Sequence, residues 1–196
     1  VVKMYAEAMS PGSPRWMQGS KQRIERVSEV EILEALGDHL RETIEDDPEL
    51  LVIWGSGGTL RTLGESIGFT ITVLGIDVTL GNENIGTDLD EAQLINTINE
   101  HKDRFKDNAR ILTLLSPMGG QGFLIGRGNL QLSPTVIRSI GIDNILAIVT
   151  PAKLATLNTL RIDTGDINLD QQFQEKKYMK ALQGYRTTRL IRISAE

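Results

Sequence analysis

The spacing of apolar residues along the chain distinguishes helical segments from buried strands. Between residues 30 and 44, apolar side chains recur every three or four positions, which is the spacing of one helix face. Ser28 and Glu31 form a capping-box pattern before this run, and Pro48 follows it, so we expect a helix that ends before the proline. The positions that carry the pattern are Val30, Leu33, Leu36, Leu40 and Ile44.

From residue 50 onward, short apolar runs alternate with segments of helical spacing. This alternation predicts an α/β fold, in which a mostly parallel, Rossmann-like sheet carries helices on both faces. Strands are expected over residues 50–54, 70–76, 110–115, 145–149, 160–162 and 189–193, the last of them near a sheet edge. Helices are expected over residues 60–67, 135–140, 152–157 and 171–182, and another after a capping box at Asp88 and Glu91.

Prolines mark the start of two of these helices. Ser133-Pro134 and Thr150-Pro151 each place a capping side chain directly before a proline at the first helical position. The chain before residue 27 reads differently, as an extended run followed by a polar loop over residues 16–21. We therefore divide the chain into an opening strand and loop, residues 1–26, and an α/β domain, residues 27–196. Because the sequence opens on Val1 within a strand-like run, we expect a further N-terminal portion before it.

Composition limits the classes of function. The net charge of −5 and the lack of a basic run argue against general binding to nucleic acid or to anionic membranes. No apolar run is long enough for a transmembrane helix, and we expect no signal peptide. The chain contains no cysteine, which excludes thiolate chemistry and agrees with a reducing compartment. We expect a cytoplasmic protein.

Candidate chemistry lies in the segments that follow the predicted strands. Ligands of parallel α/β sheets bind beyond the carboxyl ends of the strands. Each of five such segments is rich in glycine, hydroxyl or carboxylate groups, and we expect all five to meet at one edge of the sheet. The candidate ligand-binding residues are Gly55, Ser56, Gly57, Gly58, Thr59, Asp77, Gly119, Gly120, Gln121, Gly122, Arg127, Asn129, Thr150, Lys153 and Asp163.

The first of these segments, Gly55 to Thr59, raises two interpretations. Its glycines would let backbone N–H groups approach a phosphate closely, at the positive end of the following helix. Alternatively, the segment is a tight corner between a strand and a helix, closed by a threonine cap. It lacks the lysine of a Walker A loop, and Leu60 stands where a dinucleotide-binding fingerprint needs its third glycine.

Two later segments also admit a ligand-binding and a structural interpretation. Residues 119–129 hold five glycines around an apolar centre and could wrap a phosphate or sugar, with Arg127 as the cation. They could equally form a hairpin packed on the sheet by Phe123. Lys153 lies in the first turn of a predicted helix, where the helix dipole disfavours a cation, so either a nearby anion or plain solvation accounts for it.

The sequence offers no assignable catalytic residue. Asp163 and Asp166 could bind a metal or a ribose, but capping the next segment is their default role, and we predict no metal site. The histidines, His39 and His101, fall away from the strand ends, so we assign them no role. A hydrolytic triad is also not expected, because no serine has a matching histidine and aspartate.

Several long stretches resemble the ATP-NAD kinase-like family, the predicted polyphosphate- or ATP-dependent NAD kinases. The resemblance is to the C-terminal part of that family and covers most of the chain. It is carried by SPMGGQGFLIGRGNLQLSPTVIRSIG, NILAIVTPAKLATL, LRIDTGD and GYR, and more loosely by PGSPRWMQGSK and GSGGT. It implies phosphoryl transfer from ATP or polyphosphate, with Mg²⁺, to the 2′-hydroxyl of NAD.

The same resemblance implies that this chain does not act alone. Family members carry an N-terminal domain with a Gly-Gly-Asp-Gly-Thr motif, which this sequence lacks, so no catalytic residue is carried over. We expect the chain to bind a phosphorylated small molecule, to work with a missing N-terminal kinase domain, to form a homo-oligomer, and to bind neither nucleic acid nor membrane.

Two other functions remain open at this point. The strand-end segments are similar to those of the sugar-phosphate isomerase and deaminase fold, a likeness of fold alone. An enzyme of that class would need an acid/base carboxylate, for which Asp77 and Asp163 are the candidates. The chain could otherwise be a regulatory or oligomerisation module without catalysis.

Overall fold

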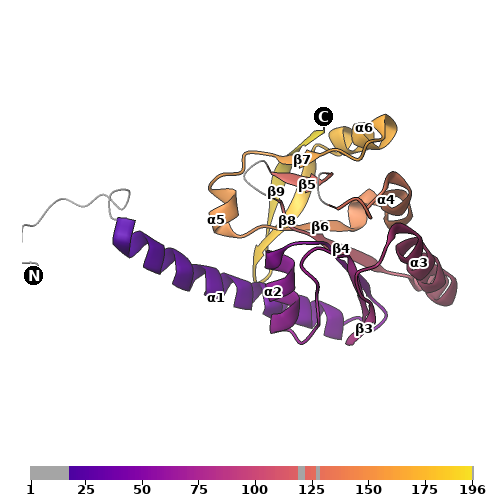
Figure 1. Ribbon diagram of the computed structural model, residues 1–196, viewed down its shortest axis with the longest axis horizontal. Helices are drawn as coiled ribbons and strands as arrows, with labels where there is room; N and C mark the ends of the chain where they lie inside the picture. Colours follow the sequence, from indigo (N-terminus) through magenta and orange to yellow (C-terminus); the bar gives the residue numbers. More distant parts are fainter. Residues whose placement is uncertain (1–17, 119–121, 127–128, 196) are drawn as a thin grey trace, which may run out of the picture.

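The computed structural model describes residues 18–118, 122–126 and 129–195, with backbone only for residues 18–28 and 195 (Figure 1). Within these residues, nine strands form one sheet in the order β3-β2-β1-β4-β6-β8-β9-β7-β5. The strands are β1 (Leu51–Trp54), β2 (Asp77–Leu80), β3 (Glu83–Gly86), β4 (Ile111–Leu115), β5 (Phe123–Ile125), β6 (Ile145–Ile148), β7 (Leu160–Ile162), β8 (Tyr178–Gly184) and β9 (Thr187–Ala195). The α-helices are α1 (Gln18–Glu45), α2 (Gly58–Ser66), α3 (Glu91–Phe105), α4 (Pro134–Ile140), α5 (Pro151–Leu154) and α6 (Ile167–Lys176), with short 3₁₀ turns at Lys106–Asn108 and Ile142–Asn144.

Strand directions divide the sheet into two parts. β1, β4, β6 and β8 run parallel to one another, with β2 antiparallel to β1 at one side. β9 returns antiparallel to β8, and β7 and β5 run parallel to β9. The mostly parallel α/β sheet is therefore confirmed, but β5 and β7 point opposite to β1, β4 and β6. The likeness to the sugar-phosphate isomerase and deaminase fold stays a prediction.

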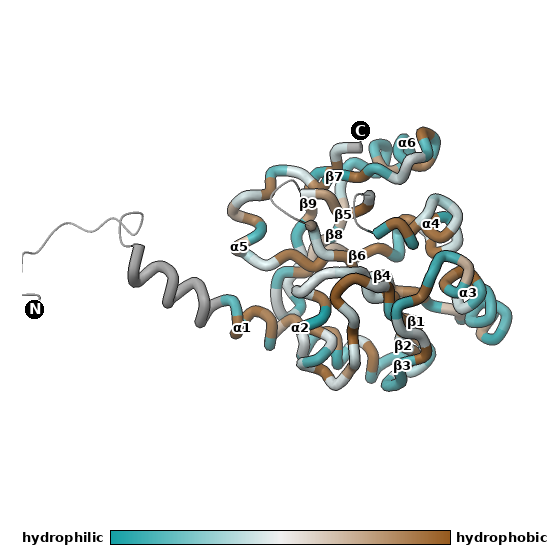
Figure 2. Tube along the Cα trace, viewed as in Figure 1, coloured by the Kyte–Doolittle hydropathy of each residue, from teal (hydrophilic) through white to brown (hydrophobic). Residues whose placement is uncertain are grey.

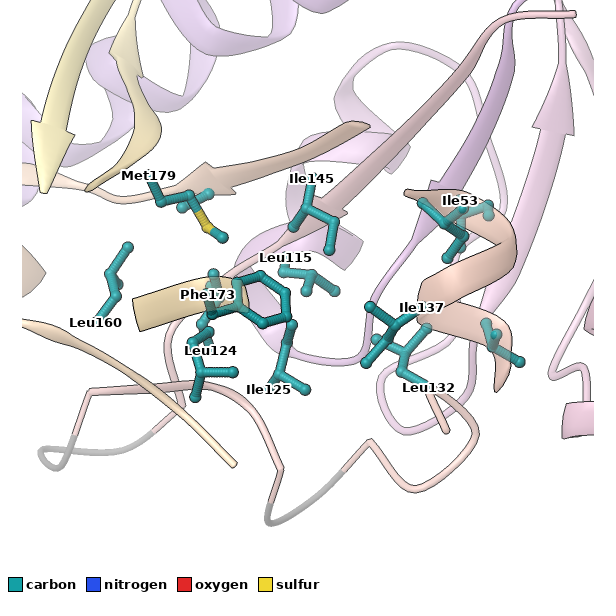
Figure 3. Packing of buried hydrophobic residues seen from close by; sticks show 14 of the residues in the cluster. Ile53, Leu115, Leu124, Ile125, Leu132, Ile137, Ile145, Leu160, Phe173 and Met179 are labelled. Carbon is teal, nitrogen blue, oxygen red and sulfur yellow. The ribbon is translucent and has the colours of Figure 1, made fainter. Parts of the chain in front are cut away.

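Alternation along the central strands builds a hydrophobic core on each face of the sheet. In β1, Leu51 and Ile53 join the core under α3, α4 and α6, whereas Val52 and Trp54 join the core under α1 and α2. Figure 3 shows the first of these cores, in which Phe173 of α6 lies against side chains from the strands. Figure 2 shows the apolar segments gathered at the centre of the molecule. Fully burying one such side chain stabilises the fold by about 1.5–3 kcal/mol.

Helix α1 begins earlier than its sequence pattern indicates. It starts at Gln18, so residues 18–21 are helical rather than part of a loop, and Ser28 lies inside the helix rather than at its cap. The predicted apolar face is partly confirmed, because Leu36, Leu40 and Ile44 are buried on the sheet. Val30, by contrast, is 56% exposed. The division of the chain at residue 26 is a separate question and stays a prediction.

Of the predicted helix starts, the one at Ser133 is confirmed and the one at Asp88 was wrong. The Ser133 side chain accepts a hydrogen bond from the Val136 amide, with Pro134 at the first helical position, as expected. Asp90 with Gln93 forms the capping box of α3, two residues after the expected pair. The Asp88 pattern was wrong because Asp88 takes a left-handed backbone conformation with φ of 51° and lies before the helix.

Three further predictions, two of strands and one of a helix, were wrong in part or in full. Residues 70–76 form a loop, and the strand begins only at Asp77, where pairing with Trp54 starts. Helix α6 ends at Lys176 because Lys177 takes a φ of 64°, so the expected helix over residues 171–182 gives way to strand β8. Strand β9 is not an edge strand of the sheet, because its residues 187–192 pair with β8 and its residues 193–195 pair with β7.

Candidate functional site

Three parallel strands end at the same edge of the sheet, and a pocket of about 500 Å³ lies there. The turns after β1, β4 and β6 supply its walls, which places segments about sixty and ninety residues apart in the sequence side by side. We call this the strand-end pocket. It is lined by Ser56, Gly57, Gly58, Thr59, Ser116, Pro117, Met118, Ala152, Lys153 and Thr156.

The three glycines in the turn after β1 differ in whether the fold requires glycine at their position. A Cβ at Gly55 would lie 2.6 Å from Leu115 Cδ2, so glycine there permits close packing of the β1 end on β4. Gly57 has a φ of 126°, a conformation that L side chains rarely adopt. A Cβ at Gly58, in contrast, would meet no described atom within 4 Å. Nothing inside the described fold requires glycine at Gly58, but a ligand approaching the backbone would.

Helix α2 presents its amino end to the strand-end pocket. Gly57 is its N-cap and makes no side-chain capping bond. The first backbone N–H groups of an α-helix have no acceptor within the helix, and they carry its positive partial charge. Gly58 and Thr59, in the first turn of α2, both line the pocket, so their amides are available to an anion that enters it.

Lys153 joins the three turns at this edge. Its ammonium group donates to Thr59 Oγ1 at 3.0 Å, to Ser116 Oγ at 2.7 Å and to the Pro117 carbonyl at 3.2 Å. The hydroxyl oxygens of Thr59 and Ser116 therefore accept from a cation, and their own protons must turn to another acceptor. Both residues line the pocket, so both hydroxyls are suited to donate to a ligand there.

Burial lowers the pKa of Lys153 from its ordinary value of 10.5, since the charged form loses solvent, while the Glu29 carboxylate opposes this effect. An anion bound in the pocket would stabilise the ammonium and raise the pKa again. Ser56 adds a further hydroxyl to the lining, and the residue is buried. The described lining of the pocket therefore combines the Lys153 ammonium, helix amides and several hydroxyl groups.

Asp77 lies at the same edge but faces inward. Its carboxylate accepts hydrogen bonds from the Thr72 amide at 2.6 Å, the Thr72 hydroxyl at 2.8 Å and the Asp88 amide at 2.9 Å. The residue is completely buried and does not line the pocket. In this structure Asp77 holds two loops to the start of β2.

The segments after β5 and β7 lie at the opposite edge of the sheet, so the expectation of five converging segments was wrong. The reason is the reversal of chain direction at β9. Asn129 accepts from the Gly126 amide and donates to the Leu124 carbonyl, which fixes the turn after β5. Asp163 pairs through its backbone with Ile125. Neither Asn129 nor Asp163 lines the strand-end pocket.

The remaining candidates divide between described and undescribed residues. Gly119, Gly120, Gln121 and Arg127 lie outside the residues that the structure describes. Gly122 begins the segment of β5, where its φ is 77° and a Cβ would lie 2.4 Å from Leu157. Thr150 is buried and does not line the strand-end pocket.

Five residues that line the pocket were absent from the sequence candidates: Ser116, Pro117, Met118, Ala152 and Thr156. Ser116 directly follows β4, so its place after a predicted strand was a usable signal. Thr156 gave no such signal, because it lies beyond α5 and reaches the pocket only through the turn of that short helix.

Metal binding and membrane spanning find no support in the described part of the chain. Within it, no three histidine, aspartate or glutamate side chains gather in a way that could hold a metal ion. The described lining of the pocket contains no carboxylate, and the Lys153 ammonium repels cations, so these residues do not suit Mg²⁺. None of the described helices is both long enough and apolar enough to cross a bilayer.

Comparison with known proteins identifies the family. Residues 49–193 match the family of the ATP-NAD kinase C-terminal domain, a range that contains β1 to β8 and most of β9. No curated protein and no solved structure matches the chain. The match confirms the resemblance found in the sequence and covers well over half of the 196 residues. The chain therefore belongs to the ATP-NAD kinase C-terminal domain family.

Proposed function

We propose that this chain is the phosphate-binding part of an NAD kinase-type phosphotransferase, and that it holds a phosphate group of ATP or NAD in the strand-end pocket. The observation that carries the proposal is the position of Lys153, whose ammonium joins the hydroxyls of Thr59 and Ser116 beside the amino end of α2. Family membership supports the NAD kinase class, and the pocket chemistry supports the phosphate.

Each group would have a defined task. The amides of Gly58 and Thr59 would donate to the phosphate oxygens, as at other helix N-termini that bind anions. The hydroxyls of Ser56 and Ser116 would donate from the sides, and Lys153 would supply the positive charge that balances the phosphate. Phosphoryl transfer depends on such positioning and charge neutralisation. Polyphosphate, as an alternative donor, would satisfy the same groups.

The chain would still need partners for catalysis. The described lining of the pocket offers neither a carboxylate base nor a metal site. We therefore propose that an N-terminal kinase domain completes the enzyme, and we propose separately that the chain forms a homo-oligomer. The sugar-phosphate isomerase alternative has less support, because Asp77 is fully engaged and Asp163 lies at the other edge.

The test is calorimetric titration of the full chain with pyrophosphate, ATP and NAD, without added metal. We expect all three to bind and to compete, because they share the phosphate group. Lys153→Met should weaken all three, while Lys102→Met, which removes a lysine from α3 on the other face, should leave them unchanged. Absence of binding by the unaltered chain would overturn the pocket assignment, and NADP formation by this chain alone would overturn the need for a partner domain.

A further inference from the structure

A second hollow adjoins the strand-end pocket on the other side of α5. Its volume is about 440 Å³, and it shares Ala152 and Thr156 with the strand-end pocket. We call it the α1–α5 groove, because α1 forms one wall and α5 the other. Figure 1 shows α1 passing beside both α2 and α5. The residues that line the groove are Glu29, Ile32, Thr150, Pro151, Ala152, Ala155 and Thr156.

The chemistry of the groove differs from that of the strand-end pocket. Ile32, Pro151, Ala152 and Ala155 give it an apolar surface made mostly of small side chains, without a cation among its described lining residues. Such a surface suits a flat, weakly polar ring far better than it suits a phosphate. The two hollows together offer a charged end and an apolar end.

Three polar residues line the groove, of which Glu29 and Thr156 are exposed and Thr150 is buried. Thr150 is 1% exposed and lines the groove, and its Oγ1 has no hydrogen-bond partner among the described residues. It also fails to cap α5, although the sequence places it at the capping position. Leaving a buried hydroxyl unpaired costs about 1–3 kcal/mol. A ligand with polar ring edges would remove that cost.

We propose that the α1–α5 groove receives the base of a nucleotide whose phosphate lies in the strand-end pocket, with the Thr150 hydroxyl bonded to the edge of the base. This inference rests on the proposed phosphate site and adds to it the part of the ligand that the groove selects. Ala152 and Thr156 line both hollows, so a ribose would lie over them.

Ribose 5-phosphate and AMP separate the two claims, because they carry the same phosphate and sugar and differ only in the base. Calorimetric titration of the full chain should give AMP an affinity about tenfold above that of ribose 5-phosphate. Ala155→Trp should fill the groove from an exposed position, which protects folding. It should weaken AMP about tenfold and leave ribose 5-phosphate within about twofold.

Thr150→Val keeps the shape of the side chain and removes only the hydroxyl. It should weaken AMP about three- to tenfold, with ribose 5-phosphate unchanged, and it should not lower the melting temperature of the free protein. Lys153→Met should weaken both ligands alike.

Three results would overturn the inference while leaving the phosphate site intact. They are equal affinities of the unaltered chain for AMP and ribose 5-phosphate, insensitivity of AMP binding to both Ala155→Trp and Thr150→Val, or equal weakening of both ligands by these variants. Failure of the unaltered chain to bind either ligand would overturn the proposed function itself.

Discussion

The two edges of the sheet carry similar residue types but use them differently. At the edge where β1, β4 and β6 end, the amides of α2 and the hydroxyls of Ser56, Thr59 and Ser116 face a pocket. At the far edge, where β5 and β7 end, the Asp170 carboxylate accepts two hydrogen bonds from Thr164, and the Asp166 carboxylate accepts one from the Leu169 amide. Polar residues after a strand therefore indicate a site only where their hydrogen-bonding capacity is still unused.

At the far edge, both carboxylate oxygens of Asp166 already have partners within the protein. One carboxylate oxygen accepts from the Leu169 amide at 2.9 Å, which caps α6. The other lies 2.7 Å from Arg138 of α4. These contacts lower the pKa of Asp166, with the Arg138 side chain as the largest cause. The role of this residue is thus to join α6 to α4, as the capping interpretation of the sequence expected.

The largest expected effect is on the stability of the far edge. Asp170→Ala removes a buried carboxylate that accepts from the Thr164 amide at 3.0 Å and from its hydroxyl at 2.7 Å. We expect urea unfolding to show a loss of about 3 kcal/mol. Pyrophosphate affinity should stay within about twofold under conditions where the variant is folded. Asn168→Ala, at an exposed position of the same helix, is the control, and a selective loss of affinity in Asp170→Ala would join the far edge to the ligand site.

The opposite pattern is expected at Lys153. Lys153→Met should lower pyrophosphate affinity about 30-fold, which corresponds to about 2 kcal/mol for a charge-assisted contact. Unfolding free energy should change little, because burial of the ammonium is itself unfavourable, as its lowered pKa indicates. Calorimetry and urea unfolding on the same sample measure both quantities. A large stability loss with unchanged affinity would make Lys153 a structural residue like Asp170.

Neighbouring glycines allow a finer comparison within the pocket. Gly57→Ala places a side chain at a φ of 126° and should destabilise the fold by about 1–3 kcal/mol. Gly58→Ala meets open space and should leave stability within about 0.5 kcal/mol, yet it should weaken pyrophosphate several-fold by crowding the helix amides. Melting curves of the two variants measure the change in stability, and calorimetry measures their affinity for pyrophosphate. Unweakened binding in Gly58→Ala would mean that the anion does not approach α2.

The smallest expected effect is a pH dependence away from the pocket. His101 of α3 is buried and donates through Nε2 to the Arg110 carbonyl at 3.1 Å, at the start of β4. Burial lowers its pKa below 6.5, so the unfolded chain binds the proton more readily. The stability from neutral His101 is complete above about pH 6.5 and is lost as the pH falls through the folded pKa.

His101→Gln provides the control for this dependence. Urea unfolding of the variant between pH 7 and pH 5 should lack the part of the slope that the unaltered chain owes to His101. An identical slope in both proteins would assign the acid sensitivity to other groups. In both proteins, pocket affinity at pH 7 should be the same.

Much of the fold could be predicted because strand and helix patterns are local. β1, β4, β6 and β7 were predicted within one or two residues, since each is a short apolar run with clear boundaries. β8 was missed because Tyr178 to Leu182 follow a helix without a glycine or proline between them, and the break occurs at Lys177 through backbone conformation alone.

The site could be predicted only in part, because the local sequence of a strand does not show in which direction the strand runs within the sheet. The turn from Gly55 to Thr59 and the later Lys153 were both candidates, and the structure brings them together. Asn129 and Asp163 were candidates for the same reason, but the antiparallel return of β9 takes them to the other edge. Thr156 reaches the pocket through tertiary packing, for which the sequence offered no signal.

Nuclear magnetic resonance titration of the full chain with inorganic phosphate tests the central claim most directly, because each backbone amide reports its own contact with the anion. We predict saturable shifts that are largest at Gly58 and Thr59, with smaller ones at Ser116 and Lys153, and with no change at Thr164 or Asp170. Shifts centred on Thr164 and Asp170, or no saturable shift at α2, would contradict the assignment of the strand-end pocket as the phosphate site.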